Sequence, residues 1–156
     1  MADESLSLLA KEVRGKTLRL LEGIDDQQAR FAAPGLSNTI LWQAGHALIV
    51  VEHLGMSPAT GKPPAYPPDW WDKFSWKSNP VTVTSWPTVE WVRSALREQL
   101  DRLLAAIEPL SEQQLSKIVD ATKNRSLRYS ILHGLHDEAG HQGEMYLLKK
   151  MYAKKQ

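Results

Sequence analysis

Four segments of the chain repeat apolar residues at steps of three and four, and this period constrains the fold more than any other feature. In the first segment, Leu6, Leu9, Val13 and Leu20 would lie along one face of a helix. Such a stripe has to be buried against another element, so the segments are expected to pack together. The segments cover residues 4–24, 38–54, 89–107 and from 127 past 151. They predict an all-α fold, a four-helix bundle.

Breakers and caps place the ends of the middle helices. Pro34 and Gly35 precede the second helix, and Ser37 is its expected N-cap. Thr88 is the expected N-cap of the third helix. Prolines exclude a long helix from the connection 55–88, which is long for a compact domain. It is therefore predicted to be a crossover between the second and third helices.

Three tryptophans lie in this connection, at positions 70, 71 and 76. They are expected either to form a lid or apolar pocket wall above a bound metal or, at least as readily, to anchor the loop to the bundle by burying aromatic surface. Substrate specificity is expected to come from residues 56–87 and the helix ends, where no motif identifies a substrate.

Composition limits the classes of function. A chain of 156 residues can bury a core without disulfides or a structural metal, and residues 1–156 are interpreted as one domain. The net charge of +1 argues against nucleic acid or a membrane as a partner. The chain has no cysteine, so thiol chemistry would need an exogenous thiol. An acidic start without a signal-peptide pattern makes the cytoplasm the expected location.

The stretch HDEAGHQGEM, residues 136–145, concentrates ionisable side chains on the fourth helix. Because a helix turns by about 100° per residue, four side chains of this region fall within about 80° of one another. They are His133, Asp137, His141 and Glu144.

The remaining ionisable residues of this stretch fall elsewhere on the helix. His136 lies about 140° from His141 and cannot easily bind the same ion. Leu148 and Met151 continue the stripe of Asp137, which is therefore expected to face the bundle interior. Buried charges are costly unless they are paired or bind metal, so a buried stripe of this kind indicates either paired groups or a metal site. His136 and Glu138 are expected to be a solvated or loop-contacting pair.

The second helix supplies a partner for this stripe. Trp42, His46, Ile49 and Val50 share one face, which predicts that His46 is buried. His46 is then expected to meet Asp137 and His141, and these three residues are the predicted metal ligands. Such a set suits Zn, Ni, Fe or Mn and leaves positions open for water or substrate. His53, two turns away, is a poor candidate and is expected, like Glu52, to be structural.

Two motifs resemble the DinB family of small metal-binding four-helix proteins, which includes bacterial low-molecular-weight-thiol transferases. One is the second-helix histidine in WQAGHALIVVEHL, and the other is DEAGHQGEMYLL on the last helix. The resemblance covers essentially the whole chain and implies a ligand triad of one histidine plus a His-x-x-x-His pair. His46 and His141 match this triad, whereas Asp137 stands where the family has a histidine.

Three functions remain open. The first is an enzyme in which the metal activates water or an exogenous thiol, with Glu144 or His133 as the catalytic proton-transfer residue. The resemblance adds thiol transfer, isomerisation or hydrolysis of a small molecule as candidate reactions. The second is a non-catalytic dimer that binds a metal or small ligand through a degenerate site. The third is a buried polar network without metal.

A homodimer is the expected assembly. The flank of the fourth helix that carries Leu132, Leu135, Ala139 and Tyr146 makes its apolar surface wider than one packing seam requires. This surplus predicts that the flank contacts a second copy.

Overall fold

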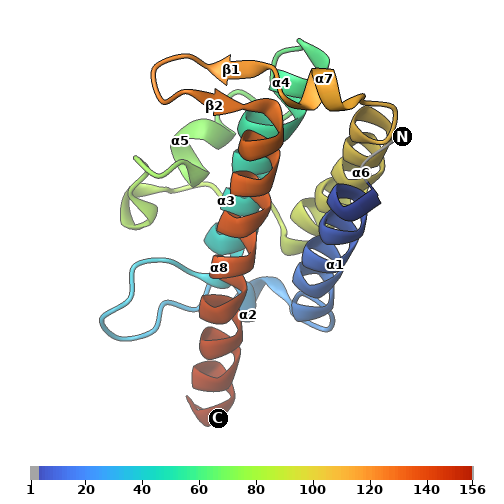
Figure 1. Ribbon diagram of the computed structural model, residues 1–156. Coiled ribbons are helices and arrows are strands. Elements are labelled where there is room, and N and C mark those ends of the chain that lie inside the picture. Colours follow the sequence, from blue (N-terminus) through green and yellow to red (C-terminus); the bar gives the residue numbers. More distant parts are fainter. Residues whose placement is uncertain (1–3, 156) are drawn as a thin grey trace.

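The computed structural model describes residues 4–155, and it is mostly helical, as predicted, with one small two-stranded sheet that the sequence analysis did not predict (Figure 1). No helix within these residues is long and apolar enough to cross a membrane. The elements in chain order are α1 (Glu4–Leu20), α2 (Asp26–Ala29), α3 (Ile40–Val51), the π-helix η1 (Glu52–Met56), α4 (Ser57–Thr60), α5 (Trp70–Phe74), the 3-10 helix η2 (Pro80–Thr82), α6 (Val89–Ile107), α7 (Glu112–Leu115), β1 (Ile118–Asp120), β2 (Arg125–Ser126) and α8 (Leu127–Lys155).

The long helices α1, α3, α6 and α8 lie side by side, with α1 and α3 each packed against both α6 and α8. Figure 1 shows α8 running the full height of the molecule, with the β1–β2 hairpin at the end opposite its C-terminus. Helix α6 has the predicted bounds and the predicted N-cap, because Thr88 Oγ1 accepts a hydrogen bond from the backbone N–H of Trp91. The first helix ends four residues earlier than predicted, at Leu20.

Helix α3 is buried at every residue because α8, α6 and α5 all pack on it. Its N-cap is Thr39 and not Ser37, since the Thr39 hydroxyl accepts from the backbone N–H of Trp42. The helical path continues past Val51 through the π-helix η1 into α4. The hydrophobic core therefore surrounds α3, and any polar side chain on this helix has to find its partner inside the protein.

The crossover between α4 and α6 lies against α3 through α5. The ring of Phe74 sits where a side chain at position 45 would be, because a Cβ on Gly45 would lie 2.3 Å from it. Trp70 is buried against Phe74 and Trp91, which confirms the anchoring role for this tryptophan. Trp76 is 57% exposed and contacts Trp71. A glycine on the helix and aromatic rings on the crossover thus hold the two together.

Candidate metal centre

Helices α3 and α8 bring together the three residues predicted as ligands. His46, Asp137 and His141 each offer one ligand atom, and these atoms lie within 4.8 Å of one another. Asp137 Oδ2 is 3.5 Å from His46 Nε2 and 3.4 Å from His141 Nε2. Ligands about 2.1 Å from a tetrahedral ion are separated by about 3.4 Å, so the two carboxylate–imidazole distances are those expected between ligands of one ion.

The ring orientation of His46 is fixed by the crossover. Its Nδ1 lies 2.6 Å from the backbone carbonyl oxygen of Phe74. A carbonyl can only accept, so Nδ1 carries the proton and Nε2 presents a lone pair toward Asp137. Trp42 stacks on the imidazole, with ring centroids 4.6 Å apart. The close approach of Phe74 to Gly45 therefore also sets the tautomer of His46, the next residue in the helix.

His141 is oriented by a second pair of side chains. Its Nδ1 is hydrogen-bonded to Oε1 of Gln43, and Nε2 of Gln43 donates to Glu144. Because a carboxylate only accepts, the Gln43 amide has to turn its NH₂ group to Glu144 and its oxygen to His141. Nδ1 of His141 is then the donor, which leaves Nε2 free to bind a metal.

Asp137 carries the feature that distinguishes this cluster from an ordinary polar contact. Its Oδ2 is buried and has no hydrogen-bond partner among residues 4–155, although it lies between two imidazoles. A buried acceptor left without a donor is costly, and a cation between Oδ2 and the two Nε2 atoms would satisfy all three at once. The donor set and this orphaned oxygen both fit a divalent metal ion.

Electrostatics favour the forms of these side chains that can bind a metal. Burial raises the pKa of Asp137, but contact with His141 and the charges of His141, His46 and His133 outweigh it, so the pKa lies below its ordinary value. Burial lowers the pKa of His46, the Phe74 carbonyl opposes this, and the charge of His141 adds to the lowering. The aspartate is thus ionised and His46 neutral near pH 7.

The two predicted proton-transfer residues lie beside the cluster. Glu144 is exposed and reaches His141 through Gln43. His133 is half-buried and stacks on Tyr129, with ring centroids 5.8 Å apart. Neither residue belongs to the group of three, and their catalytic role stays a prediction. His136 is exposed, and His53 bonds to the Tyr66 hydroxyl at 2.6 Å.

The expectation for Glu138 was wrong. This residue is 1% exposed and forms an ion pair with the buried Arg14 of α1, at 2.8 Å from Oε1 to Nε. The exposure of Glu138 was predicted wrongly because α8 is covered by α1 on one side and by α3 on another, so two separate faces of this helix are buried. The residue pattern of the sequence indicated only the face that carries Asp137.

Sequence reasoning also missed the residues that orient the ligands. Gln43 is fully buried inside the apolar run of α3, and a polar residue at such a position signals a partner. Gly45 lies mid-helix, where glycine is unfavourable unless a close contact needs it. Phe74 takes part through its backbone carbonyl, for which its residue type gives no signal.

Comparisons with known proteins agree with this architecture. The family model of the DinB superfamily matches residues 9–145. A crystal structure of a conserved protein from Enterococcus faecalis superposes with a TM-score of 0.73 at 15% sequence identity, covering 97% of each chain. At that identity the likeness shows the fold alone. No curated protein sequence matches this chain. From the family match, which spans most of its length, the chain belongs to the DinB superfamily.

Proposed function

We propose that this protein is a divalent-metal-dependent enzyme acting on a small molecule, with His46, Asp137 and His141 as metal ligands in a four-helix bundle. The observation that carries the proposal is the buried Oδ2 of Asp137, which has no donor among the described residues and lies between two Nε2 atoms. Zn, Ni, Fe and Mn are compatible with two imidazoles and a carboxylate.

A divalent ion bound there would supply a Lewis acid that makes a water or thiol molecule more acidic. The protein's own groups would orient the two imidazole rings and transfer protons. The Phe74 carbonyl and Gln43 hold the two imidazoles, and the exposed Glu144 carboxylate, which Gln43 links to His141, is the proton acceptor of this proposal. We assign proton transfer to Glu144 with His133 as the second candidate, and either thiol transfer or hydrolysis as the reaction.

Metal binding is tested first. Chelator-treated protein is titrated with Zn²⁺ and Ni²⁺ by calorimetry, and wild type is compared with His46→Ala, Asp137→Ala and His141→Ala. We expect one ion per chain and at least about a hundredfold weaker binding in each variant, more than is usual for losing a residue that only orients a ligand. His136→Ala, an exposed histidine of the same helix, is the matched control and should bind like wild type. A wild type that binds neither ion contradicts the proposal.

Catalysis is tested on the metal-loaded protein. A low-molecular-weight thiol with 1-chloro-2,4-dinitrobenzene reports thiol transfer, and p-nitrophenyl acetate reports hydrolysis. Glu144→Gln should keep the metal and lose most of the turnover. Metal-dependent turnover of neither substrate by wild type would favour a non-catalytic module. The shielding of two of the three proposed ligands supports this alternative, since the His46 and His141 side chains are 5% and 18% exposed, although that of Asp137 is 32% exposed.

We propose in addition that the protein is a homodimer in the cytoplasm. Leu132 and Tyr146, on the flank of α8 expected to contact a second copy, are 37% and 54% exposed, whereas Leu135 of the same flank is buried within the chain. Sedimentation equilibrium at micromolar concentration tests this assembly, and a monomer there contradicts it.

A further inference from the structure

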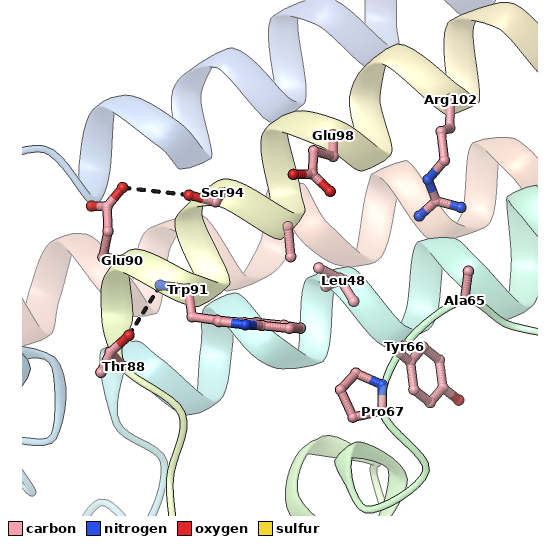
Figure 2. Close-up of a pocket in the computed structure, with 11 residues that line it drawn as sticks. Leu48, Ala65, Tyr66, Pro67, Thr88, Glu90, Trp91, Ser94, Glu98 and Arg102 are labelled. Carbon is pink, nitrogen blue, oxygen red and sulfur yellow. Dashed lines mark hydrogen bonds between the residues drawn. The ribbon is translucent and has the colours of Figure 1, made fainter.

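A cavity of about 740 Å³ lies between α6 and the part of the crossover around Tyr66. Figure 2 shows Glu98 and Arg102 projecting from α6 on one side and Tyr66 and Pro67 from the crossover on the other. None of the three candidate metal ligands lines it. Its volume falls within the range of small-molecule sites, which is roughly 300–1,000 Å³.

Aromatic and aliphatic groups form much of the cavity surface. Trp91 is 47% exposed, and its indole is anchored against the buried Trp70, with ring centroids 4.5 Å apart. Figure 2 shows the indole extending from α6 toward Leu48. A tryptophan held in place and open to solvent offers a flat apolar face whose electrons attract cations.

The charged groups of the lining differ in whether they already have partners. Arg102 is neutralised by Glu52, to which both its terminal nitrogens bond at 3.1 Å. Glu90 pairs with Arg93. Glu98 has neither an ion pair nor a hydrogen bond within residues 4–155, although Arg102 lies one turn away on the same helix. The one lining charge left free is thus a carboxylate.

We propose that this cavity is a second binding site, separate from the metal centre, for a small organic ammonium compound with an aromatic or aliphatic body. The ammonium group binds the Glu98 carboxylate, and the apolar body lies on the Trp91 indole and Leu48. A primary amine donates to the carboxylate and contacts the ring face at the same time. An anion finds no free cationic side chain here, because Arg102 is already held by Glu52.

The test uses benzylamine as the probe and benzyl alcohol as its uncharged counterpart. Binding to full-length ¹⁵N-labelled protein is followed through the tryptophan indole N–H signals. We expect saturable binding of benzylamine, at least about fivefold weaker binding of the alcohol, and a similar loss in Glu98→Gln and in Trp91→Leu. Asp101→Asn is the matched control, since it removes an exposed carboxylate from the same helix three residues away and outside the cavity.

The proposal is overturned by the absence of saturable benzylamine binding, by equal binding to wild type and Glu98→Gln, or by equal weakening in Asp101→Asn. His141→Ala, which removes a candidate metal ligand, should leave benzylamine binding unchanged. Loss of binding in that variant would place the amine at the metal centre and also reject the second site. Failure here leaves the metal proposal intact, because the two sites share no residue.

Discussion

Two adjacent carboxylates on α8 have opposite surroundings. Glu138 is fully satisfied: Oε1 accepts from Arg14 Nε at 2.8 Å and from the Thr17 hydroxyl at 2.6 Å, and Oε2 accepts from a terminal nitrogen of Arg14 at 2.9 Å. Asp137 leaves its buried Oδ2 without a donor in the described part of the chain. One residue step turns a side chain by about 100°, so Glu138 faces α1 while Asp137 faces α3.

The difference separates a structural carboxylate from one that can take a ligand. Around Glu138, Arg14 also donates to the Leu96 carbonyl at 2.7 Å and to Gln99 at 2.8 Å, so all three guanidinium nitrogens of Arg14 have a partner. The satisfied pair joins α8 to α1 and α6, and it fixes how α8 is rotated. The open oxygen of Asp137 is consequently held at a set position opposite His46, and stability and ligand binding are expected to respond to different residues.

The largest effect on stability should come from breaking the satisfied carboxylate. Glu138→Leu leaves the buried Arg14 without its counter-charge, and we expect the free energy of unfolding to fall by about 3–5 kcal/mol. Asp137→Asn should change the free energy of unfolding by less than about 1 kcal/mol in metal-free protein at pH 8, because the buried Oδ2 accepts no hydrogen bond that the substitution could break. Urea denaturation followed by circular dichroism measures both.

The double variant Arg14→Met/Glu138→Leu is the control for the first comparison. It removes both charges together, so it should recover much of the loss seen with Glu138→Leu alone. Equal destabilisation by Glu138→Leu and Asp137→Asn would show that the two carboxylates do not differ as described.

An intermediate effect is expected from the group that orients His141. Gln43→Leu removes the acceptor at Nδ1 and frees the ring, so Zn²⁺ affinity should fall by about 10- to 100-fold, less than on removing a ligand itself. Calorimetric titration of chelator-treated protein measures the change, and Gln43→Glu should restore part of it by offering an acceptor again. Unchanged affinity in Gln43→Leu would mean that the ring is held by its packing against Trp42 alone.

The smallest effect is expected in how stability depends on pH, through a third carboxylate, Glu52. Like Glu138, it is buried and hydrogen-bonded. Burial raises its pKa, but hydrogen bonds from Arg102, Gln99 and the Ala65 N–H, with the charge of Arg102, outweigh this and hold the pKa below its ordinary 4.5. Its contribution to stability is therefore complete above about pH 4.5 and is lost as pH falls through the lower folded value.

Urea denaturation at pH 7, 4.5 and 3 tests this dependence. Wild type should lose more stability than Glu52→Gln over the acidic interval, because the variant has no proton to take up at this position. Parallel curves for the two proteins would show that Glu52 titrates alike in the folded and unfolded chains.

The sequence predicted the parts of this molecule that depend on helical period. Helix α6 begins and ends where expected, and the helical period of two separate helices predicted that His46, Asp137 and His141 would lie together. These predictions succeeded because the relative angle of side chains on one helix follows from backbone geometry alone.

The missed features depend on contacts between segments far apart in the chain. The role of Phe74 rests on a carbonyl that reaches His46 from 28 residues away, and the burial of Glu138 rests on Arg14, which is 124 residues distant. The π-helix over residues 52–56 and the β1–β2 hairpin were likewise absent from the period-based prediction. Which of two faces of a helix is covered, and by what, is decided by the packing of other helices.

Gln99 has a consequence for how this chain tolerates change. Its oxygen accepts from Arg14, while its nitrogen donates to the Leu48 carbonyl at 2.9 Å and to Glu52 at 2.6 Å. Glutamate would place a second negative charge against Glu52, lysine a second positive charge against Arg14, and asparagine is one methylene shorter. In a library of all substitutions at position 99, folded protein should therefore be found almost exclusively in the variant that keeps glutamine. The residue that is hardest to replace is then an uncharged one, which lies between two ion pairs.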